Sequence, residues 1–390
     1  MALAMIQEGA EPLHYCEGSA RLLLGTGFFR PESRPARDCS VLLARSLVRQ
    51  RPLRALDLMA GCGIRSLRWG LEAQTASIWA NDADPDRLPL LEHNLAQLPA
   101  GVERRCTALT AQQLLAGCLQ RQERFDLVDL DAFGSVSALL PLALEAVRFD
   151  GVLMLASSDG RSPTGHDRPA AVRRLGAAAR AHPASWELAL RLQLGMVARC
   201  AWALGRGIEP LFNFSEGRTF RTAVRLLRRP ATGEERNLGL LAHCHGCGDQ
   251  QVQSLLQLGR WQPCGCASPA VPPLAVSGPL WIGNLQQPAT LSAMLDQAAL
   301  APLTLAAAGE RLLQRLMADP APTARCWPTE AIARALGLDQ PSLAPLVMAL
   351  QQQGFSAAVS GVMAGQLRSD APWPRILETA RAVLAATAAK

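Results

Sequence analysis

Two close pairs of cysteines offer a metal site. The segments CHGC at 244–247 and CGC at 264–266 form a C-x2-C pair and a C-x-C pair with sixteen residues between them. Two such thiolate pairs can converge on one tetrahedral zinc ion in the closed geometry of a structural site. The neighbouring glycines allow tight turns that aim backbone amides at sulfur. The pattern predicts structural Zn²⁺ held by Cys244, Cys247, Cys264 and Cys266, with His243 or His245 as the alternative to one cysteine.

A glycine-rich turn and a downstream acid indicate a nucleoside cofactor. In LDLMAGCGIRS, Asp57 stands near the end of an apolar run, and Gly61 and Gly63 make a tight turn into a helix. The next run, IWANDAD, places Asp82 at its end, where a carboxylate can bind both ribose hydroxyls of an adenosine. The full dinucleotide fingerprint would need a third glycine at Ser66. S-adenosylmethionine has no pyrophosphate, so the shorter turn predicts this cofactor.

A third apolar run ends in acids and an aromatic residue that could bind and activate an amine. The run FDLVDLDAFGS carries Asp129 and Asp131 on the same strand face, followed by Phe133. A carboxylate can accept a hydrogen bond from a purine amine and direct its lone pair toward a methyl donor. An aromatic ring can stack on a base turned out of its helix. Either acid could be the acceptor. Asp129 is expected to lie within the strand, so Asp131 and Phe133 are the predicted catalytic pair.

The elements that position these residues form an α/β pattern. From about residue 50 to 230, short apolar runs alternate with helical periods, as in βα units around a mostly parallel sheet. The segments IEPLFNFS and TFRTAVRLLR, joined at Gly217, predict an antiparallel hairpin closing the sheet. The expected fold is a doubly wound, Rossmann-like class I methyltransferase sheet with a small zinc-binding segment and a C-terminal, mainly helical, winged-helix-like domain.

Three domains are expected from these shifts in pattern. Residues 1–232 would bind S-adenosylmethionine and carry the methyltransferase chemistry. Residues 233–286 are rich in Cys, Gly and Pro and would bind zinc, and residues 287–390 are Ala/Leu-rich and would form a helical domain. The other seven cysteines are scattered singly, so burial is their expected role. They are Cys16, Cys39, Cys62, Cys106, Cys118, Cys200 and Cys326.

Composition narrows the class of protein. Apolar residues make up 49% and charged residues 18% of 390 residues, and no apolar run is long enough to span a membrane. The first residues lack the basic start of a secretory signal, so a cytoplasmic protein is expected. All but one of the 39 basic residues are arginines, and the net charge of +6 mildly favours nucleic acid. The sequence carries no signal for the oligomeric state.

Taken together, the motifs resemble the tRNA guanine-26 N2-dimethyltransferase family over nearly the whole chain. The similar segments are EGSARLLLGTGFFRPESRPARD, LDLMAGCGIRSLRWGLE, WANDAD, FDLVDLDAFGS, HPASWELALRLQLGMVARCA, SGPLWIGNL and RSDAP. The resemblance implies that Arg37, Arg65 and Asp82 contact S-adenosylmethionine. It also implies that Asp131 accepts from the guanine N2 amine and that Phe133 stacks on the base. The implied partner is tRNA, which the helical domain at 287–390 would dock.

Three positions depart from the family pattern. The proline of its Asp-Pro-Phe-Gly element is Ala132 here, which removes the ring that fixes φ. Its Asp-Ala pair corresponds to Thr110-Ala111, so Ala111 is carried over as a cofactor contact without the usual acid. Its C-terminal Arg-Thr-His-Phe stretch has become residues 359–362, VSGV.

Two other functions are compatible with the same residues. One is an amino methyltransferase acting on rRNA or DNA adenine, although its usual Asn/Asp-Pro-Pro-Tyr turn is absent. The other is a non-catalytic RNA-binding protein on the same fold, which the departures at Thr110 and Ala132 keep open.

Overall fold

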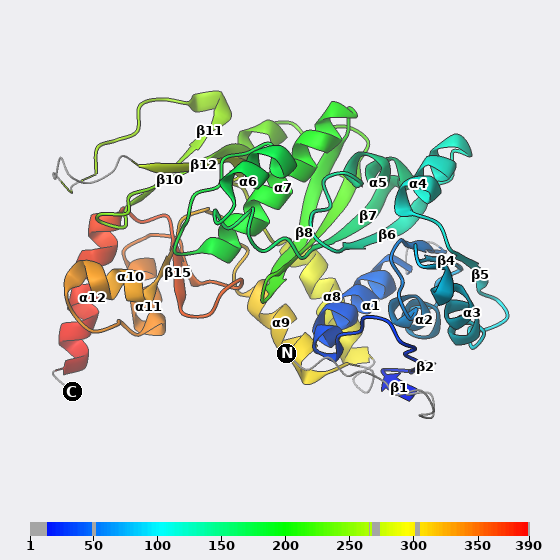
Figure 1. Cartoon of the computed structure of the whole chain (residues 1–390). Helices are drawn as coiled ribbons and strands as arrows, with labels where there is room; N and C mark the ends of the chain where they lie inside the picture. The colour runs from blue at the N-terminus through cyan, green and yellow to red at the C-terminus, as the bar shows by residue number, and fades with distance from the viewer. Residues whose placement is uncertain (1–13, 49–51, 265, 267–273, 301–304, 389–390) are drawn as a thin grey trace. The chain divides into compact units, whose positions relative to one another are not determined.

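The computed structural model describes residues 14–48, 52–264, 266, 274–300 and 305–388 (Figure 1). Backbone contacts divide the chain into two compact units. The first unit comprises Met1–Ala132, Leu139–Leu155 and Ala289–Gln314, and the second comprises Phe133–Ala138, Ala156–Pro288 and Arg315–Lys390. In the described part of the chain, no helix has the length and apolar character needed to cross a membrane.

The elements that lie wholly or mainly in the first unit follow the βα alternation that the sequence predicts. They are β1 (His14–Glu17), β2 (Ala20–Leu23), η1 (Pro31–Ser33), α1 (Arg34–Val48), β3 (Arg54–Asp57), α2 (Ile64–Glu72), β4 (Ser77–Asn81), η2 (Pro85–Arg87), α3 (Leu88–Leu95), β5 (Glu103–Thr107), α4 (Ala111–Gln120), β6 (Phe125–Ala132), α5 (Leu140–Ala146), β7 (Val147–Ser157), α8 (Pro288–Leu300) and α9 (Ala307–Met317).

The elements of the second unit include a long buried helix and two small antiparallel sheets. They are α6 (Arg168–Leu175), α7 (Ser185–Ala203), β8 (Gly207–Glu216), β9 (Thr219–Leu227), η3 (Glu234–Asn237), β10 (Leu238–His243), β11 (Gln250–Ser254), η4 (Leu255–Gln257), β12 (Ala275–Trp281), β13 (Cys326–Pro328), α10 (Thr329–Leu336), α11 (Leu343–Gln352), β14 (Ala357–Val359), β15 (Gln366–Ser369) and α12 (Trp373–Ala388).

The main sheet has seven strands within the described residues, bonded in the order β5-β4-β3-β6-β7-β9-β8. β3 pairs in parallel with β4 and β6, and β4 pairs in parallel with β5. β8 and β9 form the expected antiparallel hairpin, which turns at Gly217 with φ +57°. The predicted doubly wound, Rossmann-like α/β sheet is confirmed.

Two smaller sheets of the second unit carry the zinc segment and the C-terminal module. The zinc segment is a sheet of order β11-β10-β12, and the cysteine pairs follow β10 and precede β12. The C-terminal sheet, of order β13-β15-β14, packs with α10, α11 and α12 in the element sequence of a winged helix. Its core includes Trp327, Leu350, Leu367 and Trp373, all buried.

The prediction that the seven single cysteines are buried is wrong for Cys16, which is exposed. Cys106 and Cys200 are half-buried, and the other four are buried. Cys16 lies on β1, a strand of a two-stranded hairpin, where alternate residues face outward.

Candidate active site and metal site

The glycine turn after β3 is open to a ligand. Gly61 and Gly63 have φ values of +57° and +79°, and Gly63 is the N-cap residue of α2. A Cβ atom built on Gly61 would have no heavy atom within 4 Å, so another molecule can approach this backbone closely. At the end of β3, the buried Asp57 carboxylate accepts a hydrogen bond from Ser66 Oγ at 2.8 Å. The turn therefore combines open backbone with a fixed carboxylate.

The ionised form of the Asp57 carboxylate is destabilised by its surroundings. Burial raises its pKa to about 6, and the negative charges of Asp131 and Asp82 act in the same direction. The guanidinium of Arg65 and the hydroxyl of Ser66 oppose this rise. A cationic ligand near the turn would relieve the repulsion among the three carboxylates.

Asp82 follows β4 directly and is held beside the glycine turn. Its Oδ2 accepts from the Gly61 amide at 2.9 Å, and its Oδ1 accepts from the Asp84 amide at 3.0 Å. Because each carboxylate oxygen has two lone pairs, both oxygens can still accept from ligand hydroxyls. Asp82 is only half-buried, so those lone pairs are accessible.

Asn81 joins three segments at this edge of the sheet, a role that sequence analysis missed. Its buried amide nitrogen donates to the carbonyls of Leu58 at 3.1 Å and Leu109 at 2.8 Å. Its Oδ1 accepts from the Thr107 hydroxyl at 2.8 Å and the Leu109 amide at 3.1 Å. The ends of β3, β4 and β5 are thereby fixed relative to one another.

Thr110 stands where the family pattern has an acid, and it caps a helix. Its hydroxyl accepts from the Gln113 amide, and Gln113 returns a bond to the Thr110 backbone, which is a capping box at the start of α4. Ala111 is the first residue of the helix and is buried. The departure from the family pattern therefore keeps the helix start and removes a charge.

Arg65 connects the two acids of β6. Its guanidinium bonds the Asp129 carboxylate and donates to Asp131 Oδ2 at 3.3 Å. Arg65 and Asp129 are buried, whereas 34% of the Asp131 side chain is exposed. Residues 129 and 131 lie on one face because side chains alternate along a strand. Asp129 therefore anchors Arg65, and Asp131 is the accessible carboxylate of the pair.

Arg37 belongs to a buried ion-pair network. It bonds the Glu17 carboxylate through Nε at 2.8 Å and Nη2 at 2.6 Å. Arg68 Nη1 donates to Glu17 Oε1 at 2.7 Å and forms an ion pair with Asp38 Oδ1, also at 2.7 Å. This geometry ties the β1–β2 hairpin to α1 and α2. The structure therefore gives Arg37 a scaffolding contact in addition to the cofactor role that the resemblance implies.

Phe133, in the second unit, is presented by a braced turn. Its side chain is 80% exposed, and Gly134 beside it has φ +87°. The Gly134 amide donates to Ser158 Oγ at 2.7 Å, and the Gly134 carbonyl accepts from Ser157 Oγ at 2.8 Å and the Ser158 amide at 3.1 Å. Two consecutive serines thus hold the turn at which this chain lacks the family's proline.

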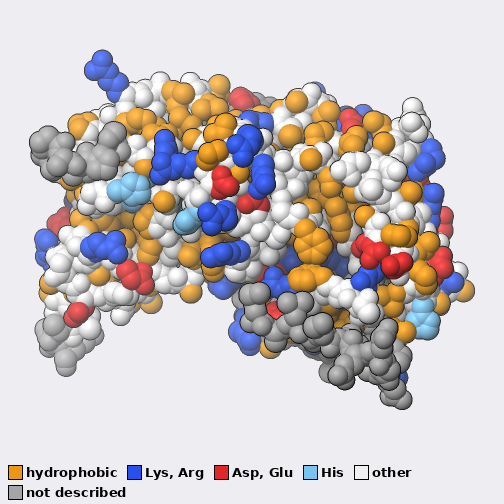
Figure 2. All heavy atoms as spheres, viewed as in Figure 1, with side chains coloured by type: hydrophobic (Ala, Val, Ile, Leu, Met, Phe, Trp, Pro, Cys, Tyr) orange, Lys and Arg blue, Asp and Glu red, His pale blue; other side chains and the backbone are white. Residues whose placement is uncertain are grey.

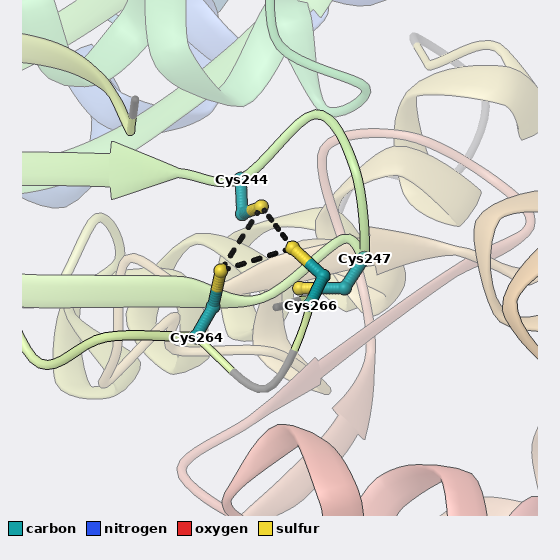
Figure 3. Close-up of side chains that lie close together, drawn as sticks. All are labelled: Cys244, Cys247, Cys264 and Cys266. Atoms are coloured by element: carbon teal, nitrogen blue, oxygen red, sulfur yellow. Dashed lines mark hydrogen bonds between the residues drawn. The ribbon is translucent and has the colours of Figure 1, made fainter. Parts of the chain in front are cut away.

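The two cysteine pairs converge as predicted (Figure 3). Their four sulfur atoms lie within 4.8 Å of one another. Cys244 Sγ is 3.3 Å from Cys266 Sγ and 3.4 Å from Cys264 Sγ, and the last two sulfurs are 3.1 Å apart. Zinc–sulfur bonds of about 2.3 Å in a tetrahedron need sulfurs only slightly farther apart than this. In the described residues, neither His243 nor His245 joins the group, so the four-cysteine alternative is supported.

The chemistry of the four thiols also fits a cation. Burial would raise the pKa of Cys244, but amides of the turn, including those of Cys247 and Gly246, donate to its sulfur, and its pKa falls to about 7. The pKa of Cys247 is raised to about 11, first by burial and also by the neighbouring Cys244. The thiols cannot all ionise together unless a cation neutralises them.

Known proteins match most of this chain. The sequence profile of the family described as N2,N2-dimethylguanosine tRNA methyltransferase matches residues 24–381. A tRNA (guanine(26)-N(2))-dimethyltransferase from Methanosphaerula palustris is 31% identical over 351 residues, covering 88% of this chain and 89% of the relative. One from Thermococcus kodakarensis is 28% identical over 388 residues, covering 94% and 98%. The structure of Trm1 from Pyrococcus horikoshii with S-adenosyl-L-methionine has a TM-score of 0.82 at 24% identity, covering 94% of this chain and 99% of that one.

Proposed function

This chain belongs to the family of N2,N2-dimethylguanosine tRNA methyltransferases, and we propose that it methylates the N2 amine of a guanine in tRNA. The target is position 26 and the product is N2,N2-dimethylguanosine, as the names of its relatives state for those proteins. Because the substrate is tRNA, we expect the protein to work in the cytoplasm. The observation that carries the proposal is the accessible Asp131 carboxylate, held by Arg65 at the end of β6.

S-adenosyl-L-methionine supplies the methyl group as an electrophilic sulfonium. We assign its binding to the open turn at Gly61 and Gly63, with Asp82 accepting from the ribose hydroxyls. The raised pKa of Asp57 supports a role for that carboxylate near the positive charge of the ligand. Three further contacts are carried over from the family pattern, namely those of Arg37, Arg65 and Ala111.

Asp131 activates the guanine amine in this proposal. The N2 lone pair is delocalised into the purine ring. A carboxylate that accepts a hydrogen bond from the N2 amine makes this lone pair more available to attack the methyl group. As the N2–carbon bond forms and the carbon–sulfur bond breaks, one N2 proton leaves to Asp131 and then to water. Arg65 bonds both Asp131 and the buried Asp129, and it thereby orients the acceptor.

The last two roles in the proposal belong to Phe133 and to zinc. Phe133 stacks on the target base, and zinc stabilises the second unit. An exposed aromatic beside a strand end can replace the stacking that the base loses when it leaves the helix. Cys244, Cys247, Cys264 and Cys266 hold structural Zn²⁺, which takes no part in the chemistry.

One assay tests the function. Purified protein is incubated with labelled S-adenosyl-L-methionine and unmodified tRNA transcripts, and the tRNA is digested to identify the methylated nucleoside. Dimethylguanosine at position 26 is the expected product. Methylated adenine, or methylation of rRNA alone, would indicate another amino methyltransferase, and tRNA binding without transfer would indicate a non-catalytic RNA-binding protein.

A variant tests the site. Asp131→Ala should lower kcat by about 10²- to 10⁴-fold and change the Kd for the cofactor far less, because Arg65 keeps its bond to Asp129. Asp150→Asn is the matched control, since Asp150 is exposed and its φ of +63° suits asparagine. An Asp131→Ala enzyme with wild-type kcat would refute the assignment.

A further inference from the structure

Arginines gather on one face of the second unit, outside the residues assigned above. The segment from Asp159 to Arg180 holds five arginines and two aspartates, a net charge of +3. Figure 2 shows basic side chains clustered over the place that α6 occupies in Figure 1. We use the name arginine surface for the exposed arginines of this segment that form no ion pair with an acid of the described residues, together with one exposed arginine of the β8–β9 turn. These residues are Arg161, Arg168, Arg173 and Arg218.

The backbone brings these residues together. The Arg161 carbonyl accepts from the amides of His166 and Asp167, which sets the start of α6 beside Arg161. Arg218 packs over Gly160, where a Cβ atom would lie 2.9 Å from Arg218 Cβ. Arg161 and Arg218 therefore lie close to the start of α6, the helix that carries Arg168 and Arg173.

The two acids of the segment from Asp159 to Arg180 already have hydrogen-bond or ion-pair partners. Arg174 donates to Asp159 at 2.8 Å, and Asp159 accepts from the amides of Arg161 and Ser162. Asp167 caps α6 by accepting from the Ala170 amide. Among the described residues, no carboxylate lies within ion-pairing distance of the four members of the arginine surface. They can therefore bind an external anion without breaking an internal pair.

The turn that carries Arg161 is rigid and is bonded to the turn that carries Phe133. Thr164 Oγ1 donates to the Gly160 carbonyl at 2.7 Å and closes the Asp159–Thr164 turn. The preceding residue of that turn, Ser158, accepts from the Gly134 amide. These bonds connect the backbone at Arg161 to the turn that carries the exposed aromatic side chain expected to hold the base.

We propose that the arginine surface binds the phosphate backbone of tRNA next to the target guanine. The inference rests on the proposed function, which supplies the polyanion. Arginine suits the role because its planar fork bonds phosphate oxygens bidentately and its charge is permanent. Phosphate contacts position a nucleic acid without reading its sequence. Such a grip would hold the nucleotides beside guanine 26 while the base enters the active site.

The test measures tRNA binding as a function of salt, without turnover. The triple variant Arg161→Gln/Arg173→Gln/Arg218→Gln should bind unmodified tRNA about tenfold more weakly near 0.15 M salt. The slope of log K against log salt should fall by about 0.7 to 0.9 per lost phosphate contact. Ethylation interference should show contacts at phosphates next to guanine 26 in the wild type that the variant lacks. The corresponding triple Arg→Lys variant should recover most of the slope.

Arg121→Gln is the control, since Arg121 is also exposed, pairs with Glu123, and lies in the first unit after α4. An unchanged slope in the triple variant with a normal melting temperature would overturn the inference, as would contacts confined to phosphates far from guanine 26. Failure of the proposed function has a different signature, in which wild-type protein transfers no methyl group. Binding is measured separately, so it tests the arginine surface in either case.

Discussion

At the scale of single residues, the buried carboxylate of Asp57 connects fold and ligand. Burial raises its pKa to about 6, helped by Asp131 and Asp82, so the group changes charge just below neutral pH. The cofactor carries a positive sulfonium and should prefer ionised Asp57. Its affinity is expected to fall as pH drops through about 6, by up to about tenfold per pH unit below the pKa.

Calorimetric Kd values between pH 5 and 8 check this expectation. In Asp57→Asn, the affinity should be weaker at pH 7.5 and nearly flat over this range, because Ser66 can still donate to the amide oxygen. A wild-type Kd that does not change between pH 5 and 7 would count against a cofactor role for Asp57.

The hydrogen bond between Ser158 and Gly134 should supply the rigidity that the turn loses by having Ala132 in place of the family's proline. Ser158→Ala removes the acceptor of the Gly134 amide, and a net loss of about 0.5–1.5 kcal/mol predicts a fall in kcat of about two- to tenfold. The Kd for the cofactor should not change, and Ser158→Thr should restore the rate because it keeps the hydroxyl. Ser135→Ala is the control in the same loop, since Ser135 bonds Ser137 instead of Gly134. Equal rates in the Ala and Thr variants would contradict the bracing role.

At the scale of elements, the periodicity of apolar residues predicts the buried strands of the main sheet but not its edge strand β5. β3, β4, β6 and β7 lie where apolar runs predicted them, because central parallel strands are covered on both faces. β5 reads ERRCT, begins with three exposed charged residues, and lies at the sheet edge. An edge strand can tolerate charge, so the chain shows no apolar signal there.

Site residues that belong to a local sequence pattern could be predicted, whereas those that act through distant partners could not. Acids at strand ends are visible because they interrupt apolar runs, as Asp82 and Asp131 do. Asn81 and Ser158 act by bonding segments that are distant in sequence, and no local pattern records those partners. The positions of cysteine sulfurs were predictable because metal ligands need fixed spacings.

The zinc segment should hold the C-terminal module in place. Trp327 Nε1 donates to the Gly248 carbonyl and Trp373 Nε1 donates to the Cys247 carbonyl, both at 2.8 Å. The two rings stack with centroids 5.4 Å apart. Loss of zinc would free the Cys244–Gly248 turn and both carbonyls. Prolonged chelation should therefore shift tryptophan emission to longer wavelength and lower the melting temperature by at least about 5 °C.

Variants separate this effect from nonspecific chelation. Cys264→Ser should reproduce both changes without a chelator, whereas Cys16→Ser, which alters an exposed cysteine of another hairpin, should change neither. A chelated protein with unchanged emission and melting temperature would show that the turn holds its shape without metal.

At the scale of the whole molecule, part of the arginine excess is buried. Arg68, Arg191 and Arg368 are among the largest fully buried side chains of the described residues. Each is paired with buried carboxylates, so part of the positive charge stabilises the interior and is not offered to nucleic acid. Net charge alone could not separate these arginines from the exposed arginine surface.

Two segments of the family resemblance meet in one such buried network. Glu187, from SWELALRLQLG, bonds Arg368, from RSDAP, through both oxygens at 2.6 Å, and it also bonds Arg191 at 2.6 Å. Arg368 also bonds Asp319 at 2.8 Å. α7 and β15 lie about 180 residues apart in the chain, and these contacts hold them together within the second unit. Breaking the network should therefore destabilise the fold without touching the site.

The pH dependence identifies the charge responsible. Burial alone would raise the pKa of Glu187, but Arg368 and Arg191 outweigh it and lower the pKa to about 2. A lowered pKa means that the ion pair stabilises the fold fully above pH 4.5 and that this stability is lost as pH falls toward 2. Glu187→Gln should cost about 3–5 kcal/mol at pH 7, since it leaves buried arginines underpaired.

Urea unfolding from pH 3 to 7 measures that difference. The gap between wild type and Glu187→Gln should be constant above about pH 5 and should narrow below pH 4.5 by about 1.4 kcal/mol per pH unit. The exposed pair Arg375–Glu378 provides the control, and Glu378→Gln should change the free energy of unfolding by less than about 1 kcal/mol. A gap that stays constant down to pH 3 would mean that packing of the Glu187 side chain, and not its charge, joins α7 to β15.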